Sequence, residues 1–144
     1  MFYHVLIPVD LSHPEQLPKL IETARQLTGD SPHADFDFLY VDDSQIHKAG
    51  SPLVDEEMKN KRRRDEKDKL LALLRNLLPD TLHYRHHVRF GTVHEKILEE
   101  SGRCNADVIV MMASKPGLGS YFVGSNAERV VRHAQCSVMI MRES

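Results

Sequence analysis

A glycine-rich stretch near the end of the chain holds the residues best suited to bind a charged ligand. It runs ASKPGLGSYFVGSN, from Ala113 to Asn126, with three glycines, three serines and one proline. It follows an apolar run, and Gly124, Ser125 and Asn126 then open a helical pattern. The first N–H groups of a helix lack intrahelical partners and lie at the positive end of its dipole. A phosphate could bind there, because Gly124 permits close approach and Ser125 adds a hydroxyl.

The same residues also fit a purely structural interpretation. Ser125 and Glu128 have the spacing of a capping box, in which the serine satisfies N–H groups of its own helix. The local sequence alone favours this plain N-cap. The choice therefore depends on where the fold places the stretch.

Length and composition are those of one soluble globular domain. The 144 residues are 41% hydrophobic and 28% charged, with a formal net charge of −2. This balance gives no reason to expect binding to nucleic acid or to an anionic membrane. Its apolar runs are too short to span a bilayer, and its first residues lack the pattern of a signal peptide. We therefore expect a cytoplasmic protein without membrane insertion, in which Cys104 and Cys136 are reduced, partly buried thiols.

Strand and helix patterns alternate along the chain. Some strand patterns are continuously apolar, as in strands buried on both faces, whereas 82–90 alternates as an exposed edge strand does. The expected strands are 2–9, 34–41, 82–90, 108–114 and 137–142. The expected helices run from between Pro14 and Leu17 to Gly29, over about 53–78, from Thr92, and from Ser125. Thr92 and Glu95 form another capping-box pair.

This alternation predicts an α/β fold: a single-domain doubly wound five-stranded parallel sheet with helices on both faces. The most apolar strands, 2–9 and 108–114, should be central and the alternating strand should lie at an edge. The predicted strand order is therefore 3-2-1-4-5. Ligands bind such sheets beyond the C-terminal ends of the strands, at the switch point between strands one and four. The stretch 113–126 lies at that point, which puts phosphate binding on an equal footing with the plain N-cap.

Four stretches resemble the universal stress protein family. They are VLIPVDLS, a strand ending in YV, GTVHEKILEESGRCNADVIVMMAS, and GSNAERVVRHAQCSVMIMR. The resemblance covers essentially the whole chain and is strongest to the short, single-domain bacterial members of the F and G types. It implies an adenine-nucleotide α-hydrolase-like fold and a regulatory role in the stress response. It also implies a homodimer joined through the last strand, and binding of ATP or another adenine nucleotide, with Mg²⁺ left open.

The resemblance implies roles for individual residues as well. Pro8 and Val9 would line the base pocket, and Asp10 would contact the adenosine. The backbone of Val41 would meet the adenine edge. The phosphates would lie against the first residues of the last helix, which are Gly124, Ser125 and Asn126.

The sequence departs from the family pattern in the phosphate loop. ATP-binding members carry Gly-x-x-Gly, nine residues, and then Gly-Ser or Gly-Thr. Here Ala113 and Pro116 occupy the two glycine positions counted from the strand end, and only seven residues separate Pro116 from Gly124. In the shorter loop, Gly117 and Gly119 would allow the backbone to approach a phosphate, and Lys115 would add charge.

Two other functions stay open. The shortened loop also fits a dimeric protein-interaction module that binds no nucleotide, with a protein partner that the sequence does not identify. A slow ATPase is the third alternative, because no GxSxG elbow and no paired cysteine indicates dedicated catalysis. In both dimeric readings the last strand, Ser137 to Arg142, is an apolar edge that favours pairing with another chain.

Two further features are assigned to the surface. The basic run 59–69 is interleaved with acidic residues at i,i+4 spacing, which is typical of a solvated helix face and not of a nucleic-acid site. The nine histidines form no HExxH motif, and His83 and His87 share a strand face with arginines. We therefore predict no metal site.

Overall fold

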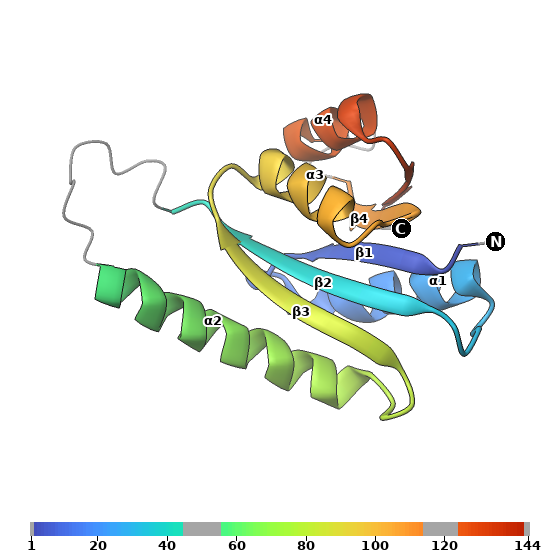
Figure 1. The fold of residues 1–144 in the computed structure, drawn as a ribbon, viewed down its shortest axis with the longest axis horizontal. Helices are drawn as coiled ribbons and strands as arrows, with labels where there is room; N and C mark the ends of the chain where they lie inside the picture. The colour runs from blue at the N-terminus through green and yellow to red at the C-terminus, as the bar shows by residue number, and fades with distance from the viewer. Residues whose placement is uncertain (1, 45–55, 114–123, 143–144) are drawn as a thin grey trace.

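The computed structural model describes residues 2–44, 56–113 and 124–142, with helices on both faces of a sheet (Figure 1). The strands are β1 (His4–Val9), β2 (Asp35–Asp42), β3 (His83–Phe90), β4 (Val108–Met112) and β5 (Ser137–Met141). The helices are α1 (Leu17–Thr28), which follows a 3-10 turn at Pro14–Gln16, α2 (Glu56–Leu77), α3 (Val93–Arg103) and α4 (Ser125–His133). The part of the predicted second helix before Glu56 lies outside the described residues. No described helix is long and apolar enough to cross a membrane.

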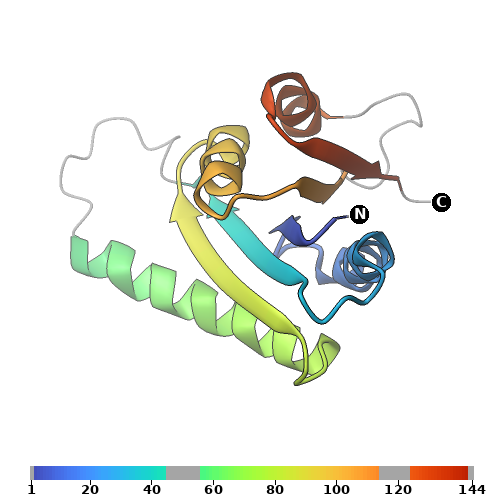
Figure 2. The ribbon, with the colours of Figure 1, turned by 45° about the vertical axis from the view of Figure 1, so that its right-hand side comes forward.

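The strand order is β3-β2-β1-β4-β5 and all four pairings are parallel, so the predicted doubly wound topology is confirmed. Figures 1 and 2 show α1 and α2 on one face of the sheet and α3 and α4 on the other. The crossovers change face between β1 and β4, which pair through Val5–Val108 and Leu6–Ile109. This pairing is the switch point of the sheet.

The core consists of two layers, one on each side of the sheet. In β1, Val5 and Ile7 face the layer beneath α1 and α2, whereas Leu6 faces the layer beneath α3 and α4. Each of these three side chains is fully buried. The continuous apolar run of β1 therefore follows from burial on both faces, because successive side chains of a strand point to opposite sides.

The helix termini differ from the sequence-based prediction in one respect. Gly29 ends α1 in the left-handed conformation, with φ 63°, as expected of a glycine at this position. Neither predicted capping box forms, however. Thr92 is the N-cap of α3 but makes no side-chain capping bond. In α4 the N-cap is Gly124, one residue earlier than a capping box requires, and Glu128 pairs instead with Arg132 at 2.9 Å.

Candidate functional site

A cavity of about 390 Å³ lies at the C-terminal ends of β1, β2 and β4. It lies at the switch point, where the two crossovers leave in opposite directions and leave a crevice at the ends of the strands. Pro8 and Val9 line it from the end of β1, Val41 from the end of β2, and Ala113 from the residue after β4. The strand order itself therefore produces the cavity.

The lining combines an apolar part with a polar part. Side chains from the sheet and α3 supply the apolar part, which includes Val9, Leu39, Val41, Val93, Ile97 and Met111. Loops, strand ends, the 3-10 turn and the start of α4 supply the polar part, which consists of Asp10, Ser12, His13, Gln16, Tyr40, Asp43 and Asn126. An apolar slot with a few convergent polar groups suits a flat heterocycle that carries a polar substituent.

The turn after β1 holds Asp10 at the cavity. The Asp10 carboxylate accepts a hydrogen bond from the Ser12 backbone N–H at 2.9 Å, and its carbonyl accepts one from the His13 N–H at 3.0 Å. The Asp10 side chain is exposed, so its remaining acceptor capacity is available to a ligand hydroxyl.

Tyr40 supplies a neutral hydroxyl to the same cavity. Burial raises the pKa of Tyr40 to about 12, and the nearby carboxylates Glu66, Asp42 and Asp10 add to the effect. The phenol therefore keeps its proton at neutral pH and can donate a hydrogen bond.

The N-terminus of α4 lies beside the cavity, since its second residue, Asn126, belongs to the lining. Ala127 and Val130 anchor the helix in the core. Gly124 at the N-cap has φ 95° and ψ 146°, and no side chain among the described residues caps this end. Among the described residues, the first N–H groups of α4 therefore have no side-chain acceptor, and they lie at the positive end of the helix dipole.

Among the described groups at the cavity, positive charge comes from the N-terminus of α4. Within the described ranges the lining includes the carboxylates of Asp10 and Asp43 but no lysine or arginine. Of the described groups, the α4 N-terminus would stabilise a bound anion most.

The structure brings six of the predicted site residues together around the cavity: Pro8, Val9, Asp10, Val41, Ala113 and Asn126. Gly124 and Ser125 begin α4 directly before Asn126 but do not line the cavity. Lys115, Gly117 and Gly119 lie outside the described residues.

Five polar residues of the lining are not among the predicted site residues: Ser12, His13, Gln16, Tyr40 and Asp43. Ser12, His13 and Asp43 closely follow the end of β1 or β2, Tyr40 lies near the end of β2, and Gln16 ends the 3-10 turn after β1. Because the C-terminal ends of parallel strands meet at one edge of the sheet, the predicted topology could have identified this segment, though not each side chain.

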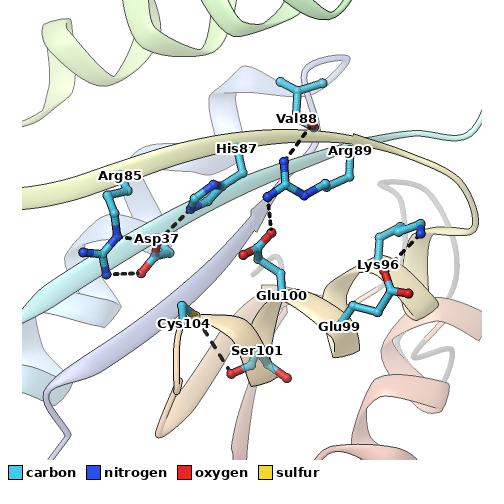
Figure 3. A network of polar contacts seen from close by, with 10 residues as sticks. All are labelled: Asp37, Arg85, His87, Val88, Arg89, Lys96, Glu99, Glu100, Ser101 and Cys104. Carbon is cyan, nitrogen blue, oxygen red and sulfur yellow. Dashed lines mark hydrogen bonds and ion pairs between the residues drawn. The ribbon is translucent and has the colours of Figure 1, made fainter.

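A second polar cluster lies between β2, β3 and α3, away from the cavity (Figure 3). Asp37, which is 1% exposed, accepts two hydrogen bonds from Arg85 at 3.0 Å and contacts the His87 ring at 2.8 Å. Buried Glu100 pairs with Arg89 at 3.0 Å. The charged groups here are matched by one another, which indicates a role in holding β3 and α3 to the sheet.

Metal binding finds no support in the part of the chain that the structure describes. No group of three or more histidine, cysteine, aspartate and glutamate side chains there could hold a metal ion. His87, which shares a face of β3 with His83, is hydrogen-bonded to Asp37. Cys104 and Cys136 are free and partly buried, as predicted.

Comparison with known proteins agrees with this architecture. A sequence model described as "Universal stress protein family" matches residues 1–142. Universal stress protein G of Shigella flexneri is 27% identical over 154 residues, covering 99% of this chain and 100% of the relative.

Two solved structures show the same fold at lower identity. Hypothetical protein MJ0577 superposes with a TM-score of 0.77 at 23% identity, covering 100% of this chain and 98% of the other. A universal stress protein in complex with cAMP superposes with a TM-score of 0.60 at 17% identity, covering 99% and 98%. With the family match extending over nearly every residue, the chain belongs to the universal stress protein family.

Proposed function

We propose that this protein is a regulatory protein that binds an adenine nucleotide in the cavity at the switch point. The observation that carries the proposal is the meeting of two features at one place. A cavity of about 390 Å³ with an apolar part adjoins a helix N-terminus that no described side chain caps. The first suits a flat base and the second suits a phosphate.

The residues present fit such a ligand in a definite orientation. The base would lie in the apolar part between Val9 and Val41, with its polar edge toward the Val41 backbone. The ribose hydroxyls would face Asp10, whose carboxylate is exposed and accepts hydrogen bonds. The phosphates would then point to Gly124 and Ser125 at the start of α4. A bound Mg²⁺ would supply positive charge that the described lining lacks.

A related protein supports this choice of ligand class. The universal stress protein that was solved with cAMP has the same fold and bound an adenine nucleotide. Adenine, ribose and phosphate are the groups that the cavity and the α4 N-terminus would recognise here.

The proposal includes assembly into a homodimer through β5. β5 is an edge strand, and its side chains are only partly buried although most are apolar. Pairing with β5 of a second copy would cover them. A nucleotide that alters the adjacent α4 and β5 could thereby change contacts with a further protein partner, which would make the binding regulatory.

The first experiment identifies the ligand. Protein purified without added nucleotide is denatured with acid, and the supernatant is separated by anion exchange against nucleotide standards. Calorimetric titrations of the ligand-free protein with ATP, ADP, AMP and cAMP follow, with and without Mg²⁺. We expect a nucleotide in the supernatant or a saturable heat for at least one of them. No release and no binding in any titration would contradict nucleotide binding and favour the interaction module.

A matched pair of variants locates the site. Asp10→Ala removes the proposed ribose acceptor and should weaken binding by about 10- to 100-fold, the worth of a hydrogen bond to a charged group. The control Asp80→Ala removes an exposed aspartate in the turn before β3 and should leave affinity unchanged. Equal affinities in both variants would place the ligand elsewhere. Gly124→Val is a poorer test, because φ 95° strains any β-branched residue at this position.

A further inference from the structure

The first half of α2 is attached to the sheet mainly by polar contacts. The buried residues of this 22-residue helix are Leu70 and Leu74, both in its second half. In the first half, Lys59 and Arg63 lie over the Phe90 ring at 5.3 and 5.1 Å. A further contact is a carboxylate cluster at the end of β2. Because no apolar side chain of this half is buried, these polar contacts set its position.

The cluster joins α2 to the last residue of β2. The Asp42 carboxylate, 2% exposed, accepts a hydrogen bond from Arg62 Nε at 2.6 Å and one from the Ser44 backbone N–H at 2.9 Å. Arg62 Nε also lies 3.1 Å from Glu66 Oε1. The other Glu66 oxygen, Oε2, is buried and accepts no hydrogen bond from the described residues. One guanidinium thus serves two carboxyl groups, of which Asp42 is 2% and Glu66 13% exposed, while Arg62 itself is 46% exposed.

We propose that Asp42, Arg62 and Glu66 form a proton-sensitive clasp, which holds the first half of α2 against the end of β2 while Glu66 is protonated and loosens when Glu66 ionises. A neutral Glu66 can donate its proton to the Asp42 carboxylate, so that the clasp carries one negative and one positive charge. An ionised Glu66 places a second, mostly buried carboxylate beside Asp42 and one arginine, and the two carboxylates repel each other.

The pKa values agree with this arrangement. Burial raises the pKa of Glu66 to about 7, and its hydrogen bond to Asp42 and the Asp42 charge act in the same direction. Burial also raises the pKa of Asp42, but hydrogen bonds from Glu66, Ser44 and Arg62 outweigh it and bring that pKa to about 2. Asp42 therefore keeps its charge while Glu66 changes its own near neutral pH.

The other titratable groups around Glu66 do not change charge in the same way. Tyr40 of β2 stays neutral, since its pKa is raised to about 12. His86 of β3 has its pKa lowered by burial and by the Lys67 charge, so it is neutral at pH 7. Arg62 stays protonated, its pKa being raised by the Asp42 hydrogen bond. Glu66 is thus the group of this cluster that titrates near pH 7.

The clasp adjoins the cavity, and its effect on ligand binding rests on the proposed nucleotide site. Asp42 follows Val41 and precedes Asp43, both of which line the cavity, and Tyr40 faces both the cavity and the clasp. Ionised Glu66 adds negative charge beside Asp10 and Asp43 and releases the chain at Asp42. Both effects weaken binding of an anionic nucleotide as pH rises.

The test compares the protein with Glu66→Gln, whose amide reproduces a neutral Glu66, and with the control Asp68→Asn, an exposed aspartate on the same helix. Side-chain carboxyl NMR should show a glutamate titrating near pH 7 in the parent protein and in Asp68→Asn but not in Glu66→Gln. Hydrogen exchange of amides 58–66, corrected for the intrinsic pH dependence, should show protection falling between pH 5 and pH 8 except in Glu66→Gln.

Stability gives a third readout with a defined sign. Because folding raises the pKa of Glu66 from 4.5 to about 7, its contribution is full below pH 4.5 and is lost as the pH rises to about 7. Between pH 5 and pH 8 the unfolding equilibrium constant of the parent should rise relative to that of Glu66→Gln, by about tenfold or more. Identical pH profiles for the two proteins, or a Glu66 that titrates near 4.5, would overturn the clasp.

The link to the cavity is measured separately. The ADP dissociation constant of the parent should rise from pH 6 to pH 8 more than that of Glu66→Gln, and equal rises would overturn the link. If no nucleotide binds at any pH, the proposed function fails. The titration, exchange and unfolding results still decide the clasp, since none of them needs a ligand.

Discussion

At the scale of single residues, Asp37 is a charged side chain buried in the middle of β2, where it needs partners to stay ionised. Burial raises its pKa, but the hydrogen bonds to His87 and Arg85 and the charges of these residues outweigh burial, so the pKa is lowered overall. The folded state therefore holds the ionised form more strongly than the unfolded chain does. Its basic partners come from β3, the edge strand, whose alternating polar face now has a physical role.

Asp37→Asn should destabilise the protein by about 1–3 kcal/mol at pH 7, because it leaves Arg85 and His87 without their charged acceptor. Asp35→Asn is the control on the same strand. Asp35 is 35% exposed and lies 3.4 Å from His4, so its loss should cost less than about 0.5 kcal/mol. Urea unfolding followed by circular dichroism measures both.

The effect of Asp37→Asn on the free energy of unfolding depends on pH with a known sign. Since folding lowers the pKa of Asp37 below 3.8, its contribution is present above pH 3.8 and is lost as the pH falls below that value. The difference in the free energy of unfolding between the parent and Asp37→Asn should therefore be smaller at pH 3 than at pH 7. An equal difference in the free energy of unfolding at pH 7 and pH 3 would show that the aspartate acts through its shape and not through its charge.

At the scale of elements, the sequence predicted the strands, the helices and their order. Burial of one or both faces of an element repeats apolar residues along the sequence at a characteristic spacing. The central strand β1 is apolar at every position after His4, and β3 alternates because one of its faces packs beneath α2 while the other carries polar side chains. These patterns extend over five or more residues, so an error at one position does not change the assignment.

What the sequence did not predict depends on single residues or on distant ones. The capping box of α4 failed because Gly124, not Ser125, occupies the N-cap, a shift of one residue. Arg62 and Glu66 have the spacing of an exposed i,i+4 pair, but the buried carboxylate of Asp42, twenty residues before Arg62, brings them into one cluster. The polar rim of the cavity likewise combines loops that are remote in sequence, so only the backbone fold brings them together.

The second half of α2 should carry most of the helix's contribution to stability. Leu74 is fully buried between α2 and the sheet, and truncating a buried leucine costs about 2–5 kcal/mol. Leu77, three residues later and 38% exposed, offers a matched control, and its truncation should cost less than about 1 kcal/mol. Denaturant midpoints of Leu74→Ala and Leu77→Ala test this. Similar losses in both would mean that the α2 packing differs from that described.

At the scale of the whole molecule, the two edges of the sheet differ. β3 carries His83, Arg85, His87 and Arg89 along one face, and α2 packs against the other. Charged side chains on an edge strand oppose pairing with another sheet. β5 instead presents Val138, Met139, Ile140 and Met141, all partly or largely exposed. This asymmetry favours β5 as the edge that meets a second copy.

The proposed dimer can be tested by placing a charge on that edge. Met139 is 37% exposed at the centre of β5, and Met139→Lys would put an ammonium group into the interface, where its desolvation costs several kcal/mol. Met58→Lys is the matched control, because Met58 is 69% exposed on α2, on the other side of the sheet from α3 and α4. Light scattering across a concentration series should show the parent and Met58→Lys as dimers, with Met139→Lys dissociating at a concentration at least about tenfold higher. Two outcomes would contradict this proposal. A parent protein that is monomeric at high micromolar concentration would contradict the dimer. A dimer that persists equally in Met139→Lys would assign the interface to another surface, and the exposed apolar edge of β5 would then have to be covered by a different protein.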